Sequence, residues 1–117
     1  MSKIDKGNFG YLGLDYQVRL IHQILTDDRF ANNIIDIVNP NYFEDETLRL
    51  IVSEVKEAFE VDEIIPDASS LEFRLVDKIN NEFTVGFIKT QIKKIKDATQ
   101  KDGPQVQKIA MNFCKQQ

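Results

Sequence analysis

The sequence predicts an all-α domain: a compact helical bundle of about six helices that ends in an antiparallel helical hairpin. The length of 117 residues suits one domain, and 42% hydrophobic residues are enough to build a core. Only 5 Gly and 3 Pro interrupt the chain. The long stretches between them carry apolar residues at steps of three and four, which is the spacing of one helix face.

The first third of the chain is expected to hold a lead-in and two helices. Residues 1–14 contain three glycines among aromatic residues and are expected to be irregular. A globular subdomain is expected from residue 15 to residue 81, and its first helix has the apolar face Val18, Ile21, Ile24 and Leu25. Asp27 is expected to cap a second helix that turns inward Phe30, Ile34, Ile35 and Val38.

Asn39-Pro40 marks the next boundary, because Asn caps helices and Pro fits a first helical position but stops the helix before it. Asp45 is expected to cap a long helix whose inward residues are Leu48, Ile51, Val52, Val55 and Phe59. After a loop around Pro66, Ser69 and Glu72 fit a capping box. The helix that follows turns inward Leu71, Leu75, Val76 and Ile79 and is broken by Asn80-Asn81.

Residues 82–117 are expected to form the helical hairpin, with a loop at 99–103 and Pro104 opening the second helix. Its apolar residues are expected to pack the two helices together and in part to reach a subunit contact: Val85, Ile88, Ile92, Ile95, Val106, Ile109 and Phe113. A purely intramolecular seam is the open alternative. The chain stops within this helical pattern, which is typical of a domain that continues into a longer protein.

Charge is divided unevenly along the chain. Residues 1–86 carry 8 Lys+Arg and 17 Asp+Glu, a net of −9, whereas residues 87–117 carry 7 Lys and 2 Asp, a net of +5. A weak, sequence-blind contact with phosphates is open to Lys89, Lys93, Lys94 and Lys96. These lysines lack the arginines and interleaved aromatic residues of base-reading surfaces, so a solvated face or an acidic neighbour is favoured over DNA.

No catalytic pattern emerges. The sequence has no phosphate-binding loop, Gly-x-Ser-x-Gly, Cys-x-x-Cys or His-Glu-x-x-His motif. His22 is the only histidine and makes a poor metal site alone, so a structural or surface role is expected; Cys114 is expected to be an unreactive thiol. Nine acidic residues lie between 44 and 67, and their spacing favours solvent-exposed helix faces over a role in acid–base catalysis.

The lone cysteine favours a reducing, cytoplasmic setting, since it excludes an internal disulfide. The first nine residues lack the apolar segment of a secretory signal, and no stretch of about 18 apolar residues is present to cross a membrane. We therefore expect a non-enzymatic chain without a cofactor, metal or membrane contact.

Four strings carry a family resemblance through their order and spacing: LIHQILTD at 20–27, IVNPNYF at 37–43, the amphipathic stretch 48–59, and IPDASSL at 65–71. Together with the expected hairpin they resemble the N-terminal domain of DnaB-type replicative DNA helicases, above all the phage branch. The resemblance spans residues 15–117, and the ATPase domain of that family is absent from this chain.

The resemblance implies the collar of a hexameric ring, in which pairs of hairpins often associate as a trimer of dimers. It also implies docking of primase and of a helicase loader, in the cytoplasm of a bacterium or a phage-infected bacterium. The full-length parent would be an ATP-dependent 5'-3' DNA helicase, and this domain its non-catalytic part. Two alternatives stay open: the helicase-binding domain of a primase, and a small DNA-binding regulator that uses the basic hairpin.

Overall fold

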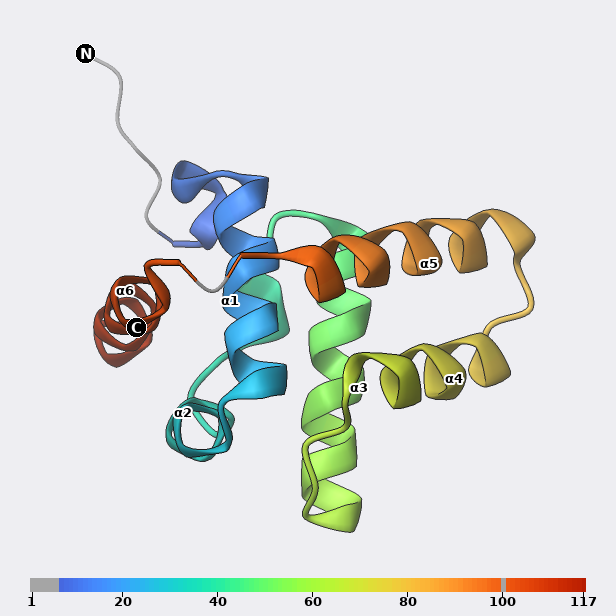
Figure 1. Ribbon diagram of the computed structural model, residues 1–117, viewed down its shortest axis with the longest axis horizontal. Coiled ribbons are helices and arrows are strands. Elements are labelled where there is room, and N and C mark those ends of the chain that lie inside the picture. The colour runs from blue at the N-terminus through green and yellow to red at the C-terminus, as the bar shows by residue number, and fades with distance from the viewer. Residues whose placement is uncertain (1–6, 100) are drawn as a thin grey trace.

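A computed structural model describes residues 7–99 and 101–117, and all regular structure in these ranges is helical. Six α-helices and two short 3-10 helices follow one another (Figure 1): η1 (Phe9–Leu12), α1 (Leu14–Thr26), α2 (Asp28–Ile34), η2 (Pro40–Tyr42), α3 (Glu46–Asp62), α4 (Ala68–Lys78), α5 (Glu82–Asp97) and α6 (Gly103–Lys115). The predicted all-α bundle of six helices is confirmed.

The prediction that residues 1–14 are irregular is wrong for part of this segment, because η1 and the start of α1 lie within it. Phe9 is fully buried and packs against Phe113 of α6, with 4.6 Å between the ring centroids. The rest of that prediction, at residues 1–6, lies outside the described residues, as does residue 100 in the expected loop at 99–103.

Two of the three N-caps predicted for α-helices are present in the structure. The side chain of Asp27 accepts from the backbone N–H of Phe30 at 3.1 Å, and that of Asp45 from Leu48 at 3.0 Å, as predicted. The capping box at Ser69 and Glu72 is wrong, because α4 begins earlier. Asp67 caps it instead, accepting from the N–H of Ser70 at 2.8 Å.

Helix α1 is the centre of the fold and contacts η1, α2, α3, α5 and α6. The sequence predicted one apolar face, but α1 is buried on nearly all sides, including Gln17, His22 and Gln23. Burying such polar groups requires hydrogen-bond partners. The structure provides them from segments far along the chain, so the polar residues of α1 join it to its neighbours.

Each of these side chains reaches a different segment. The backbone N–H of Glu44 donates to Gln17 Oε1 at 2.9 Å, which holds the approach to α3. His22 bonds to the last turn of α5, and Gln107 of α6 donates to Gln23 Oε1 at 2.7 Å. The hydroxyl of Tyr16 donates to the carbonyl oxygen of Val106, also in α6, at 2.9 Å.

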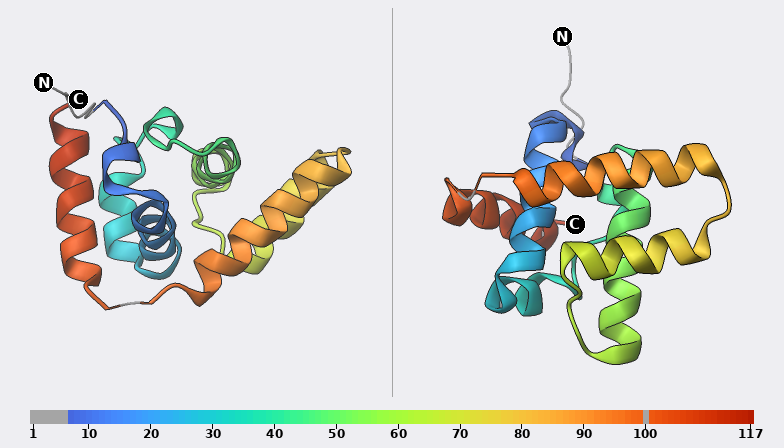
Figure 2. Two further views of the ribbon diagram at one scale, coloured as in Figure 1. Left: turned by 90° about the horizontal axis from the view of Figure 1, so that it is seen from above. Right: turned by 45° about the vertical axis from the view of Figure 1, so that its right-hand side comes forward.

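The hairpin expected at residues 82–117 is not formed. Helices α5 and α6 diverge from each other and pass on either side of α1 (Figure 2, left). Helix α5 packs against α1, α3 and α4, whereas α6 packs against α1 and α2. The reason is that α1 offers apolar surface to both helices. The apolar stripes of α5 and α6 therefore each pack into the core and not against each other.

Candidate functional site

The antiparallel pair in this fold is α4 with α5, which we call the arm (residues 68–97). Figure 1 shows the arm extending sideways past α3, with the turn between its helices at the far end. The boundary expected between residues 81 and 82 therefore falls at the tip of the arm, between two helices that pack together.

Charged side chains tie the arm to α3. Glu54 of α3 is buried, and its carboxylate accepts from Arg74 Nε at 2.9 Å and from Lys78 Nζ at 2.9 Å. Arg74 also pairs with Asp62 at 3.3 Å, and Lys78 with Glu57. The bond from Lys78 lowers the pKa of Glu57, and the bond to Glu57 raises that of Lys78. This network fixes the direction in which the arm leaves the body.

Three phenylalanines of the arm face solvent. Phe73 is 74% exposed, Phe83 80% and Phe87 62%. Phe83 and Phe87 lie one helical turn apart on α5, and Phe87 lines a groove of about 450 Å³ together with Leu50 and Pro40. We call Phe83, Phe87 and Leu50 the aromatic patch.

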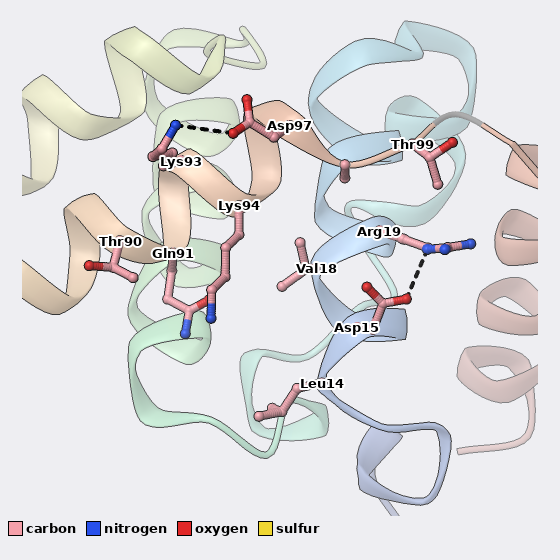
Figure 3. Close-up of a pocket in the computed structure, with 11 residues that line it drawn as sticks. Leu14, Asp15, Val18, Arg19, Thr90, Gln91, Lys93, Lys94, Asp97 and Thr99 are labelled. Atoms are coloured by element: carbon pink, nitrogen blue, oxygen red, sulfur yellow. Dashed lines mark hydrogen bonds and ion pairs between the residues drawn. The ribbon is translucent and has the colours of Figure 1, made fainter.

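A second surface, the basic groove, lies between α1 and the C-terminal half of α5 (Figure 3). It has a volume of about 670 Å³, and its apolar lining is Leu14, Val18 and Ala98. Three cations and two carboxylates surround this lining: Arg19, Lys93, Lys94, Asp15 and Asp97. Arg19 pairs with Asp15 at 3.0 Å and Lys93 with Asp97 at 3.3 Å, and both pairs are exposed enough to be screened by water.

The residues predicted for a subunit contact lie mostly in the core of the chain. The structure buries Ile88, Ile92, Ile95, Val106 and Phe113, and it leaves Val85 and Ile109 half-buried. They belong to two helices, α5 and α6, that contact α1 from different sides. A partner that docks on this fold therefore meets the side chains around this seam, and not the seam itself.

The four lysines proposed for phosphate contact are all exposed, but only two of them line the basic groove. Lys93 and Lys94 line the basic groove, whereas Lys89 and Lys96 lie outside its lining. The backbone N–H of Ser70 is the main cause of the lowered pKa of Asp67, and the charge of Lys96, which lies near the first turn of α4, adds a smaller effect. The expected weak phosphate contact stays a prediction.

His22 and Cys114, the other two residues considered in the sequence, lie in the core. His22 and Cys114 are both buried, so the structural alternative holds for the histidine, and burial raises the pKa of the thiol to about 11. In the described ranges, no three His, Cys, Asp or Glu side chains gather where they would hold a metal ion. None of the described helices combines the length and apolar character needed to span a bilayer.

The exposed phenylalanines were not predicted from the sequence. A signal was available, because Phe83 and Phe87 are four residues apart and fall off the stripe formed by Ile88, Ile92 and Ile95. Likewise, Phe73 lies on the side of α4 opposite the buried Leu71 and Leu75. Large apolar residues off the buried stripe of a helix are candidates for partner contact.

Comparisons with known proteins give no match: no protein-family model, no curated protein and no solved structure matches this chain. The candidate functional surfaces are therefore the arm, the aromatic patch and the basic groove.

Proposed function

We propose that this chain is a non-catalytic assembly and docking domain of a hexameric, DnaB-type replicative DNA helicase, and that the arm is its docking element. The observation that carries this proposal is the exposure of Phe73, Phe83 and Phe87 on a helix pair that extends from the body. The proposed helicase family is supported by the order of the sequence strings at residues 20–71. The proposed setting is the cytoplasm of a bacterium or a phage-infected bacterium.

The exposed phenylalanines of the arm present apolar area that a partner can cover. Covering one exposed phenylalanine contributes about 1.5–3 kcal/mol, so three on one arm are a strong drive toward a partner. Aromatic residues dominate the energetic centres of protein interfaces. The ion pairs of Glu54 with Arg74 and Lys78 hold the arm in one direction before binding, which lowers the entropy lost on docking.

The proposed partners are further copies of the chain, which build the ring, and a primase or helicase loader, which docks on it. The aromatic patch is bordered by Glu46 and Arg49, so its surroundings carry both signs of charge. This mixture fits a protein partner better than a nucleic acid, whose phosphates require an excess of cations.

The test is a double variant that removes both phenylalanines of the aromatic patch without touching the core. Phe83→Ser/Phe87→Ser is expected to fold with an unchanged helical content and to lose binding to a purified primase, measured by calorimetry. Ile37→Ser, which changes an exposed apolar residue away from the arm, is the control.

Wild-type protein that binds neither primase nor loader would overturn the docking role. Binding to a purified helicase ring in place of primase would assign the chain to the primase side of the same contact. Tight, steeply salt-dependent binding to DNA, lost in Lys93→Glu/Lys94→Glu, would favour the DNA-binding regulator.

A further inference from the structure

The C-terminal end of α3 carries an exposed acidic and apolar surface. Val61 is 71% exposed and Ile64 53%, and they are flanked by the exposed carboxylates of Glu60 and Glu63. Asp62 pairs with Arg74, but within the described ranges Glu60 and Glu63 make no ion pair. The nearby ammonium of Lys56 donates to the carbonyl oxygen of Val38. We call Glu60, Val61, Glu63 and Ile64 the acidic tip.

The basic groove has the opposite character. Leu14 is 49% exposed on its apolar lining, although most of the residues that follow it in α1 are buried. Lys94 extends along the groove beside Gln91 and, unlike Lys93 and Arg19, has no carboxylate partner in the part of the chain that the structure describes (Figure 3). The groove thus offers apolar contact next to an unpaired cation.

The acidic tip and the basic groove complement each other in charge, and each has exposed apolar side chains, but they lie apart on one molecule. The end of α3 points away from the crossing of α1 and α5 (Figure 1). We propose that the basic groove of one copy of this chain receives the acidic tip of a second copy, in a head-to-tail contact. Val61 and Ile64 pack over Leu14, while Glu60 and Glu63 face Lys93 and Lys94.

The division of charge along the chain supports a second copy as the occupant. The body that carries the tip is strongly acidic and the segment that carries the lysines is basic, so each copy presents both halves of the contact. A head-to-tail contact repeats from copy to copy and closes into a ring where the rotation permits. This inference rests on the assembly role proposed above, but it uses a surface other than the aromatic patch.

Reciprocal charge reversal tests the contact on the whole 117-residue chain. The first variant, Lys93→Glu/Lys94→Glu, makes the groove acidic, and the second, Glu60→Lys/Glu63→Lys, makes the tip basic. Wild type is expected to self-associate in sedimentation velocity, more strongly at low salt. Each variant alone is expected to weaken that association by about tenfold or more, because both of its surfaces then carry the same sign.

Mixing the two variants is the decisive measurement. The acidic tip of the first variant matches the unchanged groove of the second, and the reversed tip of the second matches the reversed groove of the first. The mixture is therefore expected to regain the wild-type association, although each variant alone associates more weakly. Lys108→Glu/Lys115→Glu changes the charge equally on α6, away from the groove, and is expected to associate like wild type.

Circular dichroism of every variant shows whether it has folded, so that a loss of association is not mistaken for unfolding. Two results would overturn the contact: a wild-type chain that stays monomeric at all concentrations, or a mixture that fails to regain association. If association survives both charge reversals but is lost in Phe83→Ser/Phe87→Ser, the proposed assembly role stands and this contact is wrong. If association survives the charge reversals and also survives Phe83→Ser/Phe87→Ser, both this contact and the proposed assembly role of the arm are wrong.

Discussion

The imidazole Nδ1 of His22 lies 2.7 Å from the carbonyl oxygen of Ile95, which is 73 positions later in the chain. Because a carbonyl oxygen only accepts, Nδ1 carries the proton in the neutral ring and donates it. The second ring nitrogen, Nε2, is buried without a protein partner among the described residues. One side chain of the central helix thus holds the last turn of α5.

Removing this bond is expected to loosen α5. His22→Ala leaves the carbonyl of Ile95 without its partner and opens space beside it, so we expect a loss of about 1–3 kcal/mol in the free energy of unfolding, measured in urea. His22→Asn keeps a donor close to the position of Nδ1 and is expected to lose less. Equal losses in the two variants would show that the bond contributes little and that packing accounts for the effect.

Glu54 is expected to matter more for the arm than any other carboxylate of α3. Glu54→Gln keeps the shape but removes the charge that faces Arg74 and Lys78, and we expect a loss of about 1–3 kcal/mol. Amide hydrogen exchange in α4 should speed up more than exchange in α6. Glu60→Gln, on the same helix but without an ion pair, is the matched control and should behave like wild type.

Core and surface residues of α5 are expected to respond in opposite ways. Ile88 and Ile92 are buried, so Ile88→Asp/Ile92→Asp places unpaired carboxylates in the core and should unfold a domain whose total stability is about 5–15 kcal/mol. Phe83→Ser/Phe87→Ser should leave the melting temperature within a few degrees of wild type. Circular dichroism distinguishes them, and a folded double-Asp variant would contradict the packing described above.

Acid is expected to weaken the fold through particular carboxylates. The backbone N–H of Phe30 lowers the pKa of Asp27, that of Ser70 lowers the pKa of Asp67, and Lys78 lowers the pKa of Glu57. Their stabilising contribution is complete above the ordinary carboxyl pKa of about 4 and is lost as the pH falls through the lowered values. The urea midpoint should therefore fall on acidification from about pH 5, and less so in Asp27→Asn.

Cys114 is expected to react slowly in the folded protein. Burial raises its pKa to about 11, so almost no thiolate is present near neutral pH and the sulfur is covered. A thiol reagent should label it quickly in urea and only slowly in buffer. Stability should also decline as the pH rises from about 8.5 toward 11, because the unfolded thiol ionises first. Rapid labelling of the native protein at neutral pH would contradict this.

Local features of the fold were predictable from sequence, and the pairing of helices was not. Asp27 and Asp45 cap helices through short-range hydrogen bonds that depend only on nearby residues, so their roles can be read directly. The partner of α5 depends on which surfaces compete for its stripe. Adjacency in sequence favoured α6, but the Glu54 network and the apolar surface of α3 favour α4.

The candidate site was likewise predictable from the sequence only in part. Ile88, Ile92 and Ile95 were correctly found as an apolar seam, but whether a seam meets its own core or a partner depends on tertiary structure. Lys93 and Lys94 were found from charge alone, whereas Leu14 and Val18, which complete their groove, come from a helix more than seventy positions earlier. Sequence spacing contains no information on such an encounter.

The central place of α1 also affects how the protein is made. A ribosome synthesises α1 first, yet Val106, the acceptor for its Tyr16 hydroxyl, is 90 positions later. At roughly 5–20 residues per second, about 5–20 s pass before that segment is added. Until then the apolar side chains that α6 covers remain open to chaperones and to neighbouring nascent chains, so slow translation should make this small domain prone to aggregation.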